Sequence, residues 1–518
     1  MYRLTLSILV LLFIVTAAYS QAQQMSLDGD WEGALLREGS EAKISVNFKT
    51  TAGGIEGTMT MATVGMFRQR LSKIAFKPPQ THFEQANLAA IFDGKVLHGQ
   101  ITGDLKIIGL NGTFYLKRAK NQPVPYRQEE VSFRNGKVTL AGTVTTPLAG
   151  GRHAAIVFTH GGGPDTRDLS RFYADHFARL GVASLIYDKR GVGASDPKVE
   201  WGRASFSDLA GDALAGVQLL KTRPNVDPKR IGLYGPSNGG WVVEYAAARS
   251  NDVAFIIVVS GGGIPNWESE VYRVEAQTRA ADFSADEIRE AVSFMRQKFE
   301  VARTGQGWEQ LQASIYKSRK TKWIVFVNVP RSLDRLQEAW NGQFGYDPYS
   351  DLSKLKIPVL AIFGQIDTET PAKQIAARTE EALKKAANTN YTIRVFPRAT
   401  HGIMIFPEAG KPWHFFGFAK GYLDLISRWV LRQARLKGRV KNGEGLDFIR
   451  LTSEHRAHNK SLDSYASQSP PVGDGSARPS AGTFSSASLS TMRPFRRCDS
   501  MISGTSAART CAYQTPSG

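Results

Sequence analysis

The pattern of hydrophobic and polar positions divides the chain into two parts. Over residues 26–120, short stretches such as Lys43–Phe48 and Gly112–Leu116 alternate apolar and polar positions. A period of two is typical of strands with one buried face. Frequent glycines between these stretches leave no room for long helices. We therefore expect an all-β domain, a barrel or a sandwich, over residues 26–120.

The second part, residues 129–436, follows another pattern. Ala154–Phe158 is a continuous apolar run, as a strand buried on both faces requires. Helical stretches lie between such runs, and one of them begins with the capping-box pattern Ser205-x-x-Asp208. This alternation predicts an open, doubly wound α/β sheet. The further predicted strands are Leu180–Tyr187, Ile231–Tyr234, Phe255–Val259, Val359–Phe363 and Ile393–Phe396.

One segment interrupts the alternation. Residues 264–350 are charged and prone to form helices, as in Ser284–Val292. We expect an inserted helical cap there. Between the two domains, residues 121–125 contain two prolines and predict a linker.

The first residues have the pattern of a targeting signal. Arg3 precedes the apolar run Leu4–Val15, and Ala18-Tyr19-Ser20 offers the small side chains of a signal-peptidase site. We expect a signal peptide over residues 1–22. The protein would then be exported, periplasmic or extracellular, with no stable membrane anchor after cleavage.

The last stretch of the chain has a different composition. Residues 441–518 are rich in serine and show no apolar period, which predicts a disordered tail. An over-extended reading frame or a frame shift would produce such a stretch as well. The two cysteines, Cys498 and Cys511, both lie in this tail. The body of the protein must therefore fold without disulfides and has no cysteine for a catalytic thiol or a zinc site.

The charge of the chain says little about its function. Lysines and arginines number 65 against 47 acidic residues, giving a net charge of +18. Such a surface attracts anions. The basic residues are spread along the chain without an aromatic platform, so we expect no nucleic-acid partner. Neither a phosphate-binding loop, a dinucleotide fingerprint nor a metal-ligand cluster occurs, and we expect no cofactor and no metal.

The strongest chemical motif is Gly235-Pro236-Ser237-Asn238-Gly239, which matches G-x-S-x-G. It directly follows the apolar strand Ile231–Tyr234 and precedes a helix-like stretch, Trp241–Arg249. Strand, sharp turn and helix are the context of a nucleophile elbow, in which the central serine is exposed. A glycine-rich turn without chemistry is the alternative. The context favours Ser237 as a nucleophile.

A serine hydroxyl needs a base, and His401 in Thr400-His401-Gly402 follows the last predicted strand. His414, His455 and His458 are competitors that lie nearer the tail. We expect His401 to be the base.

The base needs a carboxylate to orient it. Asp367 lies just past the carboxyl end of a core strand, where the catalytic groups of such sheets gather. Glu369 is the nearer rival, while Asp347 and Asp351 belong to turns. We expect Asp367 to fill this role.

A tetrahedral intermediate also needs donors for its oxyanion. His160-Gly161-Gly162-Gly163-Pro164 directly follows the buried strand that ends at Thr159. Backbone N–H groups of such a loop serve this purpose together with the N–H of the residue after the nucleophile. The predicted oxyanion hole is made by Gly161 or Gly162 with Asn238.

These motifs, together with Tyr187-Asp188-Lys189-Arg190-Gly191-Val192-Gly193-Ala194-Ser195, resemble those of exported bacterial serine hydrolases of the α/β-hydrolase type, esterases or serine-aminopeptidase-like proteins. A β-rich N-terminal domain that begins like Gly29–Gly33 is familiar among them, so the resemblance covers residues 26–436. One departure is Pro236-Ser237-Asn238, where His-Ser-Gln is usual, and it affects the substrate contacts beside Ser237. Asp188, Lys189 and Arg190 are interpreted as a structural turn, because glycines follow at once.

The hypothesis is a serine hydrolase that cleaves small carboxylic esters through an acyl-enzyme formed at Ser237. The cap, with Trp267 and Trp308, would cover the acyl pocket. A serine peptidase acting on short peptides is the first alternative, and acyl transfer to an alcohol or amine is a variant of the same chemistry. The peptidase needs a charged clamp for a chain terminus, and candidates are Asp165, Arg167 and Glu268. A non-catalytic ligand-binding protein is the alternative from another class.

Overall fold

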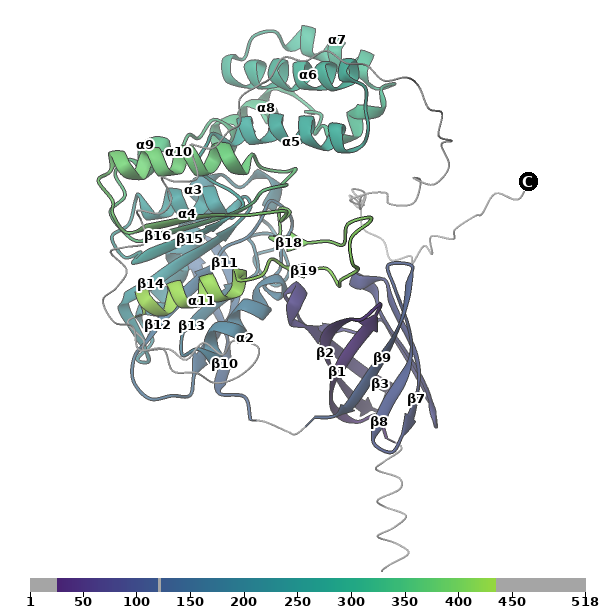
Figure 1. The fold of residues 1–518 in the computed structure, drawn as a ribbon. Coiled ribbons are helices and arrows are strands. Elements are labelled where there is room, and N and C mark those ends of the chain that lie inside the picture. The colour runs from purple at the N-terminus through teal and green to yellow at the C-terminus, as the bar shows by residue number, and fades with distance from the viewer. Residues whose placement is uncertain (1–25, 120–122, 435–518) are drawn as a thin grey trace, which may run out of the picture. The chain divides into compact units, whose positions relative to one another are not determined.

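A computed structural model describes residues 26–119 and 123–434 of the chain. The predicted signal peptide, the predicted tail with Cys498 and Cys511, and part of the predicted linker lie outside the described residues. Two sheets of different construction account for most of the described strands (Figure 1).

The first sheet has nine antiparallel strands in the order β4-β3-β2-β1-β9-β8-β7-β6-β5. Most neighbours in this order are also neighbours in sequence, so tight turns connect them. The strands are β1 Gly29–Arg37, β2 Ser40–Thr51, β3 Gly54–Met61, β4 Met66–Arg70, β5 Lys73–Lys77, β6 Gln80–Gln85, β7 Ala90–Leu97, β8 Gln100–Ile107 and β9 Leu110–Arg118.

This all-β domain buries one face of its sheet. Strand β2 alternates buried with exposed or half-buried positions, as its sequence period predicts. The ring of Phe83 stacks on that of Phe92 at 4.4 Å and meets that of Phe114 edge-on at 5.7 Å. The sheet also curls, because only Leu71 and Ser72 separate β4, at one end of the strand order, from β5 at the other end.

The second sheet has eight strands in the order β10-β11-β13-β12-β14-β15-β16-β17. From β13 to β17 all neighbours are parallel. The buried strands match the predicted apolar runs, and Phe255–Val259 has the predicted bounds. The strands are β10 Tyr126–Asn135, β11 Val138–Pro147, β12 His153–Phe158, β13 Ala183–Tyr187, β14 Val226–Pro236, β15 Phe255–Val259, β16 Val359–Gly364 and β17 Tyr391–Phe396.

The beginning of this sheet differs from the prediction. Instead of alternating with helices, β10 and β11 form an antiparallel hairpin in which Asn135 pairs with Val138. Gly136 in the two-residue loop has a φ of +56°, which glycine adopts at no steric cost. A loop this short brings the second strand back antiparallel to the first, and β11 is also antiparallel to β13, so the sheet is mixed.

Helices cover both faces of the sheet (Figure 1). Buried side chains of α3, α4 and α10 pack on one face, and those of α2 and α11 pack on the other. Helix α3 begins with the predicted capping box, in which Ser205 and Asp208 bond each other's backbone N–H. These helices are α2 Arg171–Arg179, α3 Phe206–Lys221, α4 Gly239–Ala247, α10 Ala372–Lys385 and α11 Tyr422–Gln433. A small two-stranded sheet, β18 Met404–Ile405 with β19 Gly417–Phe418, precedes α11.

The expected helical insertion lies between β15 and β16. Its helices surround a hydrophobic cluster of their own that includes Val274, Met295 and Trp323. The helices are α5 Asn266–Ala280, α6 Ala285–Thr304, α7 Trp308–Ser318, α8 Leu333–Ala339 and α9 Tyr349–Leu352. A doubly wound sheet, an inserted helical cap and a preceding all-β domain are thus all present, and the predicted fold class is confirmed.

Membrane-spanning helices were sought in the same residues. Among residues 26–119 and 123–434, none of the helices combines the length and the apolar composition needed to cross a bilayer.

Candidate active site

Ser237 occupies a strained turn between β14 and α4. Its φ is +51°, a left-handed conformation that side-chain-bearing residues rarely adopt. Such a residue costs on the order of 1–3 kcal/mol and persists only where its surroundings hold it. The Ser237 N–H donates to the Val259 carbonyl at the end of β15, at 2.7 Å. The turn is therefore anchored to the neighbouring strand.

The glycines on either side of this turn are sterically required. A Cβ at Gly235 would lie 2.1 Å from the carbonyl oxygen of Gly239. A Cβ at Gly239 would lie 2.6 Å from Oγ1 of Thr159. Both distances are shorter than atoms allow, so only glycine lets the strand and helix approach this closely.

Asp367 and His401 are joined by a hydrogen bond. The Nδ1 atom of His401 lies 2.8 Å from Oδ2 of Asp367. The Asp367 side chain is fully buried, and its oxygens also accept the N–H groups of Glu369 and Thr370 and the Thr370 hydroxyl. Because a carboxylate accepts only, the proton of this imidazole lies on Nδ1. This tautomer leaves the lone pair on Nε2.

Glu369, the sequence rival of Asp367, takes another position. Its Oε2 atom lies 3.6 Å from Nε2 of His401, on the opposite edge of the imidazole, and its side chain is 40% exposed. Of the other rivals, Asp347 pairs with Arg378 at 2.6 Å. The carboxylate that holds Nδ1 of His401 is therefore that of Asp367.

The end of β15 connects the serine turn to the histidine loop. Val259 accepts the Ser237 N–H, and the next residue, Ser260, donates its hydroxyl to the His401 carbonyl at 2.7 Å. Ser260 has a φ of +55°. The structure thus fixes both backbones to adjacent residues of one strand end.

The glycine loop after β12 faces the serine turn. A Cβ atom added at Gly161 would lie 3.8 Å from Cβ of Ser237. One added at Gly162 would lie 3.9 Å from Cβ of Asn238. The Gly161 N–H, however, donates to Oδ2 of Asp165 at 2.8 Å. In the described ranges, no hydrogen bond engages the N–H of Gly162 or of Asn238. Two of the three predicted oxyanion donors are therefore available.

His160, at the start of this loop, has a structural role. Its Nε2 lies 2.6 Å from the Tyr187 carbonyl. Burial lowers the pKa of His160 to about 4, so the ring is neutral near pH 7 and donates from Nε2. A neutral histidine with this proton engaged does not compete with His401.

Comparison with known proteins gives further evidence on this domain. Residues 150–294 match the family model described as serine aminopeptidase, S33, a stretch that contains Ser237 but neither Asp367 nor His401. The esterase EstD of Thermotoga maritima is 25% identical over 372 residues, covering 68% of this chain and 81% of that protein. A thiohydrolase of Arthrinium phaeospermum is 29% identical over 220 residues, covering 42% and 68%. A putative carboxymethylenebutenolidase of Synechocystis is 28% identical, and the match spans 60% of its length, less than two thirds.

Among solved structures, an esterase of Pyrococcus furiosus aligns with a TM-score of 0.39 at 16% identity, covering 61% of this chain and 96% of that one. The family match falls on the sheet whose order and serine turn are described above. The second domain has the α/β-hydrolase fold. The esterase and the thiohydrolase that the chain resembles are both hydrolases.

The cap of this hydrolase contacts the site through helix α5. The Tyr272 hydroxyl donates to the Asp367 carbonyl at 2.7 Å, and the Ser269 hydroxyl donates to that of Glu369 at 3.4 Å. Trp267 and Trp308, predicted to cover an acyl pocket, pack against the cap's own hydrophobic cluster. Helix α5 thereby braces the loop that carries Asp367.

The residues predicted as candidates to bind a peptide terminus all make hydrogen bonds or ion pairs within the protein. Asp165 accepts the Gly161 N–H, and Arg167 bonds Asp188 at 2.9 Å in a buried pair. Glu268 accepts a hydrogen bond from Gln374 at 3.2 Å.

Sequence reasoning missed Glu244, in the helix after the nucleophile turn. Its carboxyl group is buried and accepts the Gly263 N–H at 3.1 and 3.2 Å. Burial raises the pKa of Glu244 to about 8. The neighbouring loop packs directly behind the serine, since a Cβ at Gly261 would lie 1.9 Å from the Ser237 carbonyl oxygen. A single glutamate in a helical stretch carries no sequence signal of such a position.

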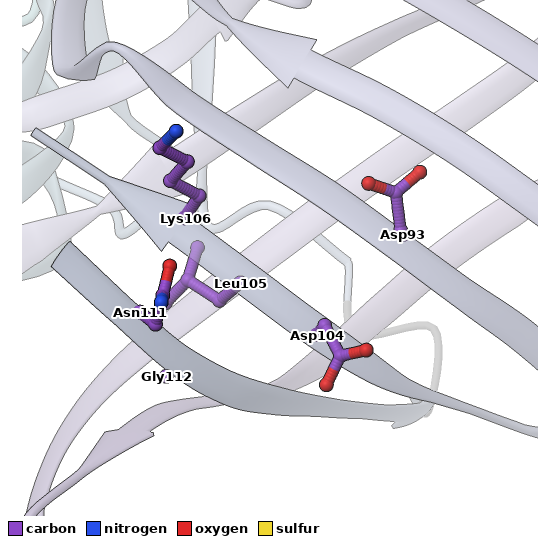
Figure 2. A pocket seen from close by; sticks show the side chains of 6 residues that line it. All are labelled: Asp93, Asp104, Leu105, Lys106, Asn111 and Gly112. Atoms are coloured by element: carbon purple, nitrogen blue, oxygen red, sulfur yellow. The ribbon is translucent and has the colours of Figure 1, made fainter. Parts of the chain in front are cut away.

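A hollow of about 340 Å³ lies elsewhere, on the β-domain (Figure 2). Asp93 and Asp104 are partners on the neighbouring strands β7 and β8 there. Its lining is Asp93, Asp104, Leu105, Lys106, Asn111 and Gly112, so it shares no residue with the Ser237 site. Within the described part of the chain, no three His, Cys, Asp or Glu side chains converge as a metal site requires.

Proposed function

We propose that this hydrolase cleaves carboxylic esters through a Ser237–His401–Asp367 triad. The observation that carries the proposal is the 2.8 Å hydrogen bond between His401 and the buried Asp367. The turn of Ser237, whose φ is +51°, and the loop of His401 are tied to adjacent residues at the end of β15. A buried carboxylate on Nδ1 orients the imidazole and stabilises its protonated form. In the proposed reaction Nε2 takes the serine proton.

The reaction has two halves. The Ser237 hydroxyl oxygen attacks the acyl carbon while its proton passes to Nε2 of His401. The C–O bond to the leaving alcohol then breaks, and the alcohol takes that proton. Water attacks the resulting acyl-enzyme with His401 again as base, which releases the acid and restores the serine.

The oxyanion would be held by the N–H groups of Gly162 and Asn238. These are the two predicted donors that are not engaged, whereas the Gly161 N–H is taken by Asp165. Losing one such donor typically costs about 10²–10³-fold in kcat.

The experiment that tests this function is turnover of p-nitrophenyl esters of increasing acyl length by the wild type, Ser237→Ala and Asp367→Asn. We expect Ser237→Ala to abolish turnover and Asp367→Asn to lower kcat by about 10²–10⁴-fold, because the imidazole loses its orienting charge. His414→Ala is the matched control and should retain full activity, since Nδ1 of His414 lies near the Phe415 carbonyl and not a carboxylate. Undiminished ester turnover by Ser237→Ala would refute the assignment of the nucleophile.

A second candidate function is cleavage of short peptides from the amino terminus. The matching family description and the carboxylate of Glu369, 3.6 Å from Nε2 of His401, favour it. A carboxylate beside the reacting centre attracts a substrate ammonium group. If the protein is a peptidase, alanyl p-nitroanilide should be cleaved in preference to its N-acetyl form, and Glu369→Gln should remove that preference. Equal cleavage of both anilides would argue against this function.

A further inference from the structure

Lys189 is a buried lysine whose side chain is hydrogen-bonded to the glycine loop. Its side chain lies among buried groups, with only 3% of the residue exposed. Its Nζ donates to the Gly161 carbonyl at 2.9 Å and to the Gly163 carbonyl at 3.0 Å. The ring of Trp201 lies 5.5 Å from the same ammonium group. A desolvated lysine is costly unless it is bonded in this way.

The first of these bonds fixes the direction of another group. The Gly161 carbonyl and the Gly162 N–H belong to one peptide group, which is planar and trans. In a trans peptide the C=O and N–H bonds point in opposite directions. With Lys189 bonded to the oxygen, the Gly162 N–H must point away from the lysine. A Cβ atom added at Gly162 would lie 3.9 Å from Cβ of Asn238. This peptide group therefore lies next to Asn238, whose N–H is the other proposed oxyanion donor.

The charge of Lys189 adds to this orientation. A cation bonded to a carbonyl oxygen polarises its peptide group and makes the N–H a stronger donor, an effect enhanced in a poorly solvated site. The second bond, to the Gly163 carbonyl, holds the peptide group between Gly163 and Pro164 on the same ammonium group.

Asp165 acts on the same loop. Its carboxylate accepts the Gly161 N–H. The backbone carbonyl of Asp165 accepts the backbone N–H of Lys189 at 3.2 Å. Burial lowers the pKa of Lys189, and the charge of Asp165 opposes that shift. Of the two loop glycines predicted as oxyanion donors, these side chains engage the Gly161 N–H and the Gly161 carbonyl and leave the Gly162 N–H available.

We propose that Lys189 is a positioning residue that orients and polarises the Gly161–Gly162 peptide so that its N–H stabilises the oxyanion. This inference rests on the proposed ester hydrolysis at Ser237. It gives a mechanistic role to a residue that the sequence places in a structural turn.

The test compares Lys189→Met with the wild type and with Lys198→Met, an exposed lysine that serves as the matched control. Methionine keeps most of the side-chain volume but donates nothing. We expect kcat for the best ester to fall about 10–100-fold in Lys189→Met, with KM changed by less than about threefold, because the interaction acts on the transition state. Lys198→Met should match the wild type.

A second readout separates this role from packing. An aryl boronic acid forms a tetrahedral adduct with the serine and mimics the transition state, so its inhibition constant should rise by the same factor as kcat/KM falls. Lys189→Arg restores the cation and donors and should recover at least part of kcat. Circular dichroism melting curves establish that each variant is folded, and Lys189→Gln replaces Lys189→Met if the latter is not.

The outcomes are distinct. An active wild type with unchanged kcat and boronate inhibition in a folded Lys189→Met overturns the role of Lys189 alone. A fall in kcat without a parallel rise in the boronate constant overturns it as well. If the wild type neither cleaves esters nor binds the boronate, the proposed function fails and the inference fails with it.

Discussion

The two domains bury different kinds of side chain. In residues 26–119, the buried polar side chains are those of Thr81 and Gln85, both uncharged. The hydrolase domain buries many charged ones, including Arg167, Asp188, Lys189, Arg190, Asp212, Glu244, Lys298 and Asp367. Apolar contacts thus hold the first core, whereas the second combines two apolar clusters with many buried ionisable side chains.

This difference has a functional meaning. Buried charges cost free energy, so they persist where they are paired or hydrogen-bonded, and catalytic sites are among such places. Asp367 and Lys189 follow β16 and β13 and lie at the carboxyl end of the parallel sheet, next to the proposed catalytic groups. The β-domain has no comparable concentration among its described residues. Its stability should therefore depend on packing more than on buried charge.

The largest expected effect comes from breaking a buried ion pair. Arg190 and Asp212 lie 2.7 Å apart with side chains 6% and 1% exposed. Asp212→Ala leaves the arginine with only the more exposed Asp208 and should destabilise the hydrolase domain by about 3 kcal/mol. Urea unfolding measures the loss in the free energy of unfolding. Peptide-resolved hydrogen exchange shows which domain loses protection.

The matched control for that change is Asp252→Ala. Its partner Lys221 lies 2.7 Å away, but both side chains are about one-third exposed. An exposed pair contributes about 0–1 kcal/mol, so the free energy of unfolding should hardly change. Equal losses of stability in Asp212→Ala and Asp252→Ala would contradict the conclusion that buried ion pairs contribute more to stability than exposed ones.

A smaller effect should depend on pH. Burial raises the pKa of Glu244 from its ordinary 4.5 to about 8. The folded state then holds a proton that the unfolded state releases, so stability falls as pH rises from 4.5 towards 8. Glu244→Gln, which stays neutral, should remove up to about 2 kcal/mol of that fall between pH 5 and pH 6.5.

Urea midpoints at the two pH values provide the measurement. Glu309→Gln makes the same chemical change on an exposed helix surface and should leave the wild-type dependence intact. A Glu244→Gln variant as sensitive to pH as the wild type would show that this carboxyl group is not the cause.

The smallest effect is expected in the β-domain. Phe92 is fully buried and stacks on Phe83, so Phe92→Leu should cost about 1–2 kcal/mol by loss of packing. This loss should be the same at pH 5 and pH 8, because no charged group is involved. Leu97→Ala, at a side chain that is 51% exposed, serves as the control with little expected change. A marked pH dependence of the Phe92→Leu loss would break the contrast between the domains.

The sequence predicted the parts of the fold that periodicity controls. The strand Phe255–Val259 and the capping box of α3 were visible because apolar runs and capping residues act over a few neighbouring positions. The hydrogen bond between Asp367 and His401 agrees with the predicted pairing, since each follows a core strand and such ends meet at one edge of a sheet.

Other features depend on contacts between distant residues. The acceptance of the Gly161 N–H by Asp165 depends on a side-chain rotamer, and sequence spacing does not specify one. Lys189 bonds two carbonyls 26 and 28 residues away, which a local turn interpretation cannot reveal. Glu244 meets Gly263 only because β15 brings the two segments together.

The helical insertion leaves from one parallel strand and returns to its neighbour. Strands β15 and β16 pair directly, with Ile256 beside Val359, so the sheet is continuous whatever the length of the chain between them. The insertion also has its own hydrophobic cluster. It is therefore a sub-structure with a core of its own that is tied to the loop of Asp367 by Tyr272 and Ser269. A change in its surface can leave the sheet intact, whereas a change in helix α5 reaches the proposed catalytic carboxylate.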